Sequence, residues 1–142
     1  MAVPLRESGL AIYGEGRGAA LCDFDHDGRL DLVVGQNRGE TKLYRNARAK
    51  PGLRIHLQGS AENAQAVGAT VRVVFHGGRL GPVREIRLGG GYWSQDSGDL
   101  VLGLRDEAEA VEIRWPGGAF ERVSVARGTG TLSRNIPRRA DP

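Results

Sequence analysis

The sequence lacks several features that would define its class at once. Cys22 is the only cysteine, so no disulfide can form within the chain. No apolar run approaches the roughly 18 residues that a membrane-spanning helix needs, which excludes insertion by a helix. The first residues show no basic segment followed by an apolar one, so no signal peptide is visible in this chain. No stretch carries a helical stripe with caps at both ends. We therefore expect a chain built from strands around an ordinary hydrophobic core.

The charge balance is slightly basic but lacks the pattern of nucleic-acid binding. Twenty lysines and arginines oppose 17 acidic residues, which gives a net charge of +3. Only Lys42 and Lys50 are lysines, and the arginines are spread along the chain. No basic run alternates with aromatics, as a groove that follows a nucleic-acid strand requires. We expect a solvated, arginine-rich surface and no nucleic-acid partner.

Glycine is abundant, with 22 in 142 residues, and it separates short runs in which apolar and polar residues alternate. Alternation of this kind is typical of half-buried strands. After residue 52 it predicts seven strands, at residues 53–58, 69–75, 82–88, 99–104, 110–115, 119–125 and 131–136. Many short strands of even spacing are typical of a sandwich or barrel. The sequence therefore predicts an all-β fold, with a small antiparallel β-sandwich or barrel over residues 53–136 and a tail at 137–142.

The first 46 residues have a different pattern. Short apolar runs at residues 10–13, 19–24, 32–34 and 41–45 predict three or four strands and nothing else. A small sheet of this size is marginal in water, so it needs a neighbour to cover one face. Residues 47–52, which are polar and end in Pro-Gly, are the expected linker between two domains.

An acidic loop at residues 23–31, with the pattern D-x-D-x-D-G-x-x-D, carries the strongest functional signal. Its carboxylates belong to Asp23, Asp25, Asp27 and Asp31. Carboxylates this close repel one another unless a cation lies among them, and oxygen ligands at alternate positions suit calcium. Arg29, at the seventh position, can add its backbone carbonyl, while a glycine at the sixth permits the sharp turn. The loop is therefore predicted to bind calcium.

This loop is not an EF-hand. Its twelfth position is Val34, where an EF-hand has a bidentate glutamate, and short strand-like runs flank it where helices are expected. His26 lies between the ligands, at a position that we expect to point outward into solvent.

The other candidate catalytic residues do not form a unit in the sequence. Ser94 and Ser97 lie outside any G-x-S-x-G frame, and His56 and His76 lie on strands with no indicated partner. We expect structural hydrogen bonding from them and no hydrolase activity.

One loop combines aromatic and polar residues after a triple glycine. Tyr92, Trp93, Gln95 and Asp96 can form a surface that stacks on sugars or binds peptides. The alternative is that the two aromatics plug the end of the sandwich.

Taken together, these segments resemble two known families. Residues 19–34, closing with residues 43–46, resemble one FG-GAP/VCBS repeat, which is a calcium-loop blade of integrin-like β-propellers. The following part resembles the ASPIC/UnbV domain in residues 53–59, 63–69, 84–85, 89–95, 102–104 and 111–118. The resemblance implies a propeller blade whose loop holds calcium, followed by a small β-domain. Because a propeller typically needs 4 to 8 blades, the expectation is the C-terminal end of a longer protein.

These observations favour a calcium-binding, non-catalytic adhesion or interaction module. The expected partner is a protein or carbohydrate surface, and the unpaired strand edges allow an edge-mediated dimer or missing propeller blades. The resemblance implies an extracellular or periplasmic location. The alternative is an accessory protein or metal-dependent enzyme of a biosynthetic pathway, which uses the acidic loop as a catalytic metal site. Such a site keeps an open position beside a general base, and the sequence around the loop offers none.

Overall fold

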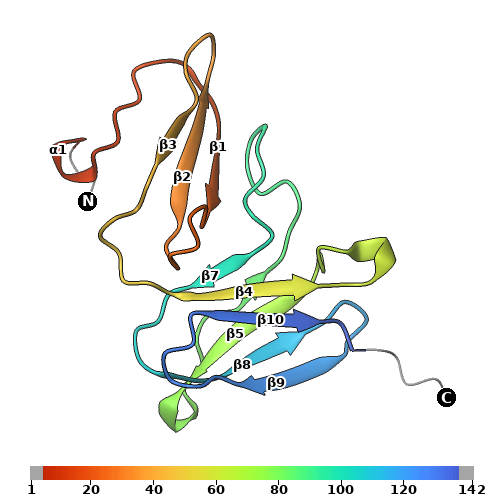
Figure 1. Ribbon diagram of the computed structural model, residues 1–142. Coiled ribbons are helices and arrows are strands. Elements are labelled where there is room, and N and C mark those ends of the chain that lie inside the picture. Colours follow the sequence, from red (N-terminus) through yellow and green to blue (C-terminus); the bar gives the residue numbers. More distant parts are fainter. Residues whose placement is uncertain (1–4, 138–142) are drawn as a thin grey trace.

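The part of the chain after residue 52 forms a β-sandwich in the computed structural model, which describes residues 5–137 (Figure 1). One sheet has the order β10-β4-β7, and the other has the order β6-β5-β8-β9. Their bounds are β4 Leu53–Gln58, β5 Thr70–Phe75, β6 Arg84–Glu85, β7 Leu100–Leu102, β8 Ala108–Arg114, β9 Phe120–Ser124 and β10 Thr131–Asn135. All seven expected strands are present. The all-β prediction is confirmed, and neither sheet closes into a barrel.

One pairing departs from the expected antiparallel arrangement. β10 runs parallel to β4, with Leu132 beside Ile55 and Ser133 beside His56. The chain leaves β9 in one sheet and enters β10 in the other, so no hairpin turn fixes the direction of β10. Short 3-10 turns at Ala61–Asn63 and His76–Gly78 complete this part.

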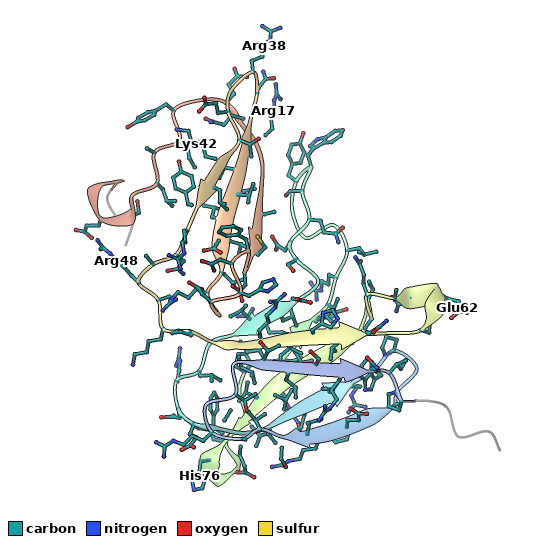
Figure 2. The ribbon with its side chains drawn as sticks, viewed as in Figure 1. Arg17, Arg38, Lys42, Arg48, Glu62 and His76 are labelled. Carbon is teal, nitrogen blue, oxygen red and sulfur yellow. The ribbon has the colours of Figure 1, made fainter. Side chains whose placement is uncertain are left out.

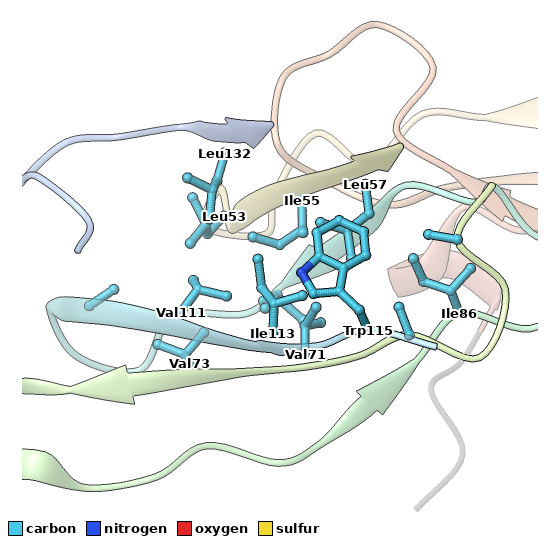
Figure 3. Close-up of a cluster of buried hydrophobic side chains, with 14 of the residues drawn as sticks. Leu53, Ile55, Leu57, Val71, Val73, Ile86, Val111, Ile113, Trp115 and Leu132 are labelled. Carbon is cyan, nitrogen blue, oxygen red and sulfur yellow. The ribbon is translucent and has the colours of Figure 1, made fainter. Parts of the chain in front are cut away.

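The hydrophobic core lies between these two sheets (Figure 3). Alternate residues of β4 face inward, which buries Leu53, Ile55 and Leu57. Ile113 and Trp115, at and just beyond the end of β8, are buried against them. Each large side chain that is fully buried in this way stabilises the fold by about 1.5–3 kcal/mol. The period-two pattern in the sequence therefore locates the core correctly.

The third sheet comes from the first part of the chain. It has the order β1-β2-β3, with β1 at Gly16–Cys22, β2 at Asp31–Gln36 and β3 at Lys42–Tyr44, all antiparallel. A single helical turn, α1 at Leu5–Ser8, precedes it. No helix in residues 5–137 is long and apolar enough to cross a membrane.

Two local predictions for this sheet are wrong. Residues 10–13 form no strand, and β1 begins at Gly16, within the stretch that was expected to be a turn. The glycines in β1 reflect a close approach between two segments of the chain at Gly18. A Cβ atom at that position would lie 3.0 Å from the Tyr92 carbonyl oxygen, so a glycine-rich strand is what allows the loop after residue 89 to approach β1.

The first sheet contributes nothing to the main core cluster, whose described members all lie between residues 53 and 136. It contacts the sandwich through backbone hydrogen bonds. The amide of Gly52 donates to the Gly28 carbonyl at 2.7 Å, and the amide of Ser97 donates to the Leu21 carbonyl at 2.9 Å. Residues 47–52 form no strand and lead directly into β4.

Candidate functional site

The acidic loop connects β1 to β2 and is folded by its own side chains. The amide of Asp27 donates to Oδ1 of Asp25, and the amide of Arg29 donates to Oδ1 of Asp27. The amide of Gly28 donates to Oδ2 of Asp23 at 3.1 Å. Gly28 has a φ of 81°, in the left-handed region that favours glycine. The expected turn at the sixth position of the loop is therefore present.

Three of the predicted ligands converge. Asp23, Asp25 and Asp27 each offer a carboxylate oxygen, and these three oxygens lie within 4.8 Å of one another. Asp23 is only 7% exposed, and its Oδ1 is buried with no hydrogen-bond donor in the part of the chain that the structure describes. An isolated carboxylate oxygen away from water is costly unless a cation or a donor meets it. This donor set fits a hard cation such as calcium.

Two arginines neutralise the exposed side of this cluster. Arg45 donates to Oδ2 of Asp25 at 2.5 Å and to Oδ2 of Asp27 at 3.1 Å, and Arg29 donates to Oδ2 of Asp27 at 2.8 Å. Burial acts to raise the pKa of Asp27, but the hydrogen bonds and charge of Arg29, helped by Arg45, lower it overall. The pKa of Arg45 is raised, mainly by its hydrogen bond to Asp25. Asp27 and Arg45 are therefore held in their ionised forms.

The fourth predicted ligand, Asp31, lies outside this group. It is 1% exposed, and its two carboxylate oxygens accept the amides of Phe24 and Asn46 at 3.1 and 2.8 Å. Asp31 therefore links the start of the loop, at Phe24, to Asn46, which follows the end of β3. Both oxygens face backbone donors, so the structure gives this carboxylate a role in holding the loop closed.

A hollow of about 90 Å³ lies where the acidic loop meets the sandwich. Asp23, Asp27 and Gly28 line it from the loop, and Gly52 and Thr131 line it from the starts of β4 and β10. A space of this size accommodates an ion or a few waters. His26 also lines the hollow, although it is exposed overall, as expected for its position. The Arg29 carbonyl stays a predicted ligand.

The aromatic loop divides into a tip and a base. At the tip, Tyr92 and Trp93 are 76% and 84% exposed and pack edge to face, with ring centres 6.2 Å apart. They do not plug the sandwich. At the base, Oδ1 of Asp96 accepts the amide of Leu21 at 2.8 Å, so this carboxylate fastens the loop to β1. Gln95 is exposed between tip and base. The aromatics therefore face solvent, while Asp96, which is also exposed, contacts β1 through its Oδ1.

The structure also forms a cluster that the sequence analysis missed. Nδ1 of His56 lies 2.6 Å from Oδ1 of Asp99, and Arg54 donates to Oδ2 of the same carboxylate. Burial acts to raise the pKa of Asp99, but these partners lower it overall. Ser133 lies beside His56 in the strand register, yet no hydrogen bond joins the two within residues 5–137. Alternation places Arg54 and His56 on the outer face of β4, but nothing in the sequence indicates the pairing with Asp99.

The basic side chains are spread over the molecule, as expected for a solvated surface. Figure 2 labels Arg17, Arg38 and Lys42 on the first sheet and Arg48 in the linker, away from His76 on the sandwich. Ser94 and Ser97 lie in the loop that approaches β1, and neither hydrogen-bonds to a histidine among the described residues.

Comparison with known proteins agrees with the second half of the predicted organisation. The family described as ASPIC and UnbV matches residues 59–135, more than half of the chain, and the chain belongs to this family. Its similarity to individual proteins extends further. It is 33% identical over 121 residues to cartilage acidic protein 1 of Xenopus tropicalis, and 34% identical over 120 residues to the protein of that name from Mus musculus.

These alignments cover 81% and 80% of the chain, so they reach beyond the residues that the family match spans. They cover only 18% of each relative. The chain therefore corresponds to a small part of the relatives that it matches.

Proposed function

We propose that this chain is a calcium-stabilised, non-catalytic interaction module of an extracellular protein. Calcium binds among Asp23, Asp25 and Asp27, with the Arg29 carbonyl as a further ligand, while Asp31 holds the loop closed behind them. The observation that carries this proposal is the buried Oδ1 of Asp23, which has no donor among the described residues. The same carboxylate offers an oxygen that lies within 4.8 Å of oxygens from Asp25 and Asp27. A bound cation removes both the desolvation cost and the mutual repulsion.

The ligand chemistry favours calcium over magnesium. Calcium accepts six to eight oxygens in flexible geometry, whereas magnesium requires a smaller octahedral shell and releases its waters reluctantly. Three carboxylates and a carbonyl from one short loop supply part of a calcium shell, and the adjoining hollow leaves room for water ligands. Zinc and other softer metals prefer nitrogen and sulfur ligands. Cys22 lies next to the loop, but it is not a member of the converging group.

Calcium in this position also fastens the two parts of the chain together. The Gly28 carbonyl accepts the amide of Gly52, so the loop touches the linker at its inner turn. An ion that fixes the loop therefore fixes the first sheet against the starts of β4 and β10, where the chain has little apolar burial of its own.

The first sheet itself is proposed to be a blade of the FG-GAP/VCBS type. The support is a calcium-type loop between two antiparallel strands, β1 and β2, followed by a third strand. Further blades or a second copy of the chain would pair at the outer edge of β3, because residues 96 and 97 already hydrogen-bond to β1 at Leu21.

The interaction surface is proposed at the exposed pair Tyr92 and Trp93. Aromatic side chains in solvent are anchors for protein or carbohydrate partners. An extracellular location is supported by similarity to relatives whose name refers to cartilage, and the same name supports a role other than catalysis.

The proposal is tested by thermal unfolding in calcium, in magnesium and in a chelator. Calcium should raise the melting temperature more than magnesium does, and Asp25→Asn should abolish the response. Asp106→Asn is a matched control, because it also removes an exposed carboxylate that pairs with an arginine, away from the loop. An unmutated chain whose melting temperature is the same in all three solutions would overturn the proposal.

A further inference from the structure

The sandwich has a cavity at one open side, and its lining residues differ from those of the acidic loop. Its volume is about 490 Å³, within the range of pockets that bind small molecules. It lies between the two sheets, with Val73 and Phe75 of β5 on one side and Val101 and Leu102 of β7 on the other. None of its lining residues belongs to the calcium loop.

The cavity exists because both sheets end here in short strands. β7 is an edge strand of three residues, and β6 covers only Thr70 and Val71 of β5. Beyond β6, the segment around Leu80 lies along β5 instead, with the amide of Gly81 donating to the Val73 carbonyl. The backbone of β5 is therefore satisfied. Val73, Phe75 and Leu102 are themselves buried, and the apolar surface that is open to solvent in the cavity belongs to Leu80, Pro82 and Val101. Leu80 is 49% exposed at this opening.

The charge of the lining is entirely positive. Arg79, Arg84 and Arg105 line the cavity, and no aspartate or glutamate does. Arg79 is already occupied, because it pairs with Asp106 and stacks over the ring of Phe75 at 5.1 Å. The side chains of Arg84 and Arg105 have no carboxylate or hydrogen-bond partner within residues 5–137. Two free guanidinium groups thus flank an apolar floor.

We infer that this cavity binds a small amphipathic carboxylate, with the apolar body against Leu80, Pro82 and Val101 and the carboxylate at Arg84 and Arg105. Guanidinium groups match carboxylates in planar, two-pronged hydrogen bonds. The apolar lining stabilises the complex by burying the apolar surface of the ligand, which a small anion such as acetate largely lacks. A neutral apolar ligand leaves the arginines unpaired, and a short anion leaves the floor uncovered, so both parts of the ligand are needed.

The test compares three probes, namely decanoate below its micelle concentration, decanol and acetate, by amide chemical shifts in a chelator-containing buffer. Decanoate should shift the amides of Leu80, Val101 and Arg105 in a saturable way and bind at least tenfold more tightly than decanol or acetate. The double variant Arg84→Gln/Arg105→Gln should lose at least tenfold in affinity. The control is Arg122→Gln on β9, which forms the other edge of the sheet that contains β6. This variant should bind decanoate as the unmutated chain does.

A second variant tests the apolar half of the site. Leu80→Ser, at a half-exposed position that tolerates a polar side chain, should weaken decanoate binding while the spectrum of the core stays unchanged. No saturable shift with decanoate, equal binding of decanol, or undiminished binding in the double arginine variant would each overturn the inference. Because the buffer contains no free calcium, these outcomes are independent of the calcium proposal.

Discussion

The backbone amide of Leu21 donates a 2.8 Å hydrogen bond to Oδ1 of Asp96, which lies 75 residues further along the chain. The amide of Ser97 returns the contact by donating to the Leu21 carbonyl at 2.9 Å. Together these bonds seat the base of the aromatic loop on the edge of β1. The first sheet is therefore held to the sandwich at two points, one at this loop and one at the linker beside the acidic loop.

Removing the Asp96 carboxylate should weaken the attachment of the aromatic loop to β1. Asp96→Ala deletes one hydrogen bond, whose net value is about 0.5–1.5 kcal/mol. Amide hydrogen exchange at Leu21 and its neighbours in β1 should then accelerate about two- to tenfold, while β8 stays protected. Asp106→Ala provides the comparison. Unchanged exchange in β1 would show that the loop does not hold this edge.

The stability of the fold should reside in the sandwich. Ile113 is fully buried between the sheets, so Ile113→Ala should lower the free energy of unfolding by about 2–5 kcal/mol. Leu43 on β3 is 48% exposed, and Leu43→Ala should cost less than about 1 kcal/mol. Urea denaturation of both variants measures the difference. Equal losses would mean that the first sheet shares the main core.

The sequence carries enough information for the strands and the core because both depend on local alternation. Leu53, Ile55 and Leu57 face inward as their spacing predicts, and the seven strands after residue 52 follow from the same pattern. The loop at residues 23–31 is equally local, which is why the convergence of its first three aspartates was predictable.

Long-range contacts were not predictable in this way. The parallel pairing of β10 with β4, the pairing of His56 with Asp99 and the fastening of Asp96 to Leu21 join segments that are far apart in sequence. Asp31 shows the same limit at short range. Its spacing is that of a ligand, and the backbone amides of Phe24 and Asn46 that its two oxygens accept could not be predicted from that spacing.

Asp31 and Asp25 should therefore behave differently in the absence of calcium. Asp31→Asn replaces one acceptor oxygen by a donor that faces a backbone amide, so it should lower stability by about 1–3 kcal/mol even in chelator. Asp25→Asn removes only an exposed ion pair with Arg45 and should cost less than about 1 kcal/mol there. Denaturation in chelator distinguishes the two, and equal costs would contradict the assigned role of Asp31.

Acid should weaken the cluster around Asp99. Its pKa is lower in the folded chain than its ordinary value of 3.8, so its stabilising effect is fully present above that value and is lost as the pH falls through the folded pKa. Asp99→Asn should therefore lower the free energy of unfolding by about 1–3 kcal/mol at pH 7. The difference in this free energy between the variant and the unmutated chain should shrink below about pH 4. Denaturation curves from pH 7 to pH 3 measure this, and a constant difference would contradict it.

Calorimetric titration of calcium into the unmutated chain tests the central claim most directly. If the affinity is that of extracellular calcium modules, the dissociation constant is about 0.1–1 mM. Free calcium at ten times this constant then adds about 1.4 kcal/mol to the free energy of unfolding. The account predicts saturable binding of one calcium per chain, its loss in Asp25→Asn and its retention in Asp106→Asn. The absence of saturable calcium binding, or binding that survives Asp25→Asn unchanged, would contradict it.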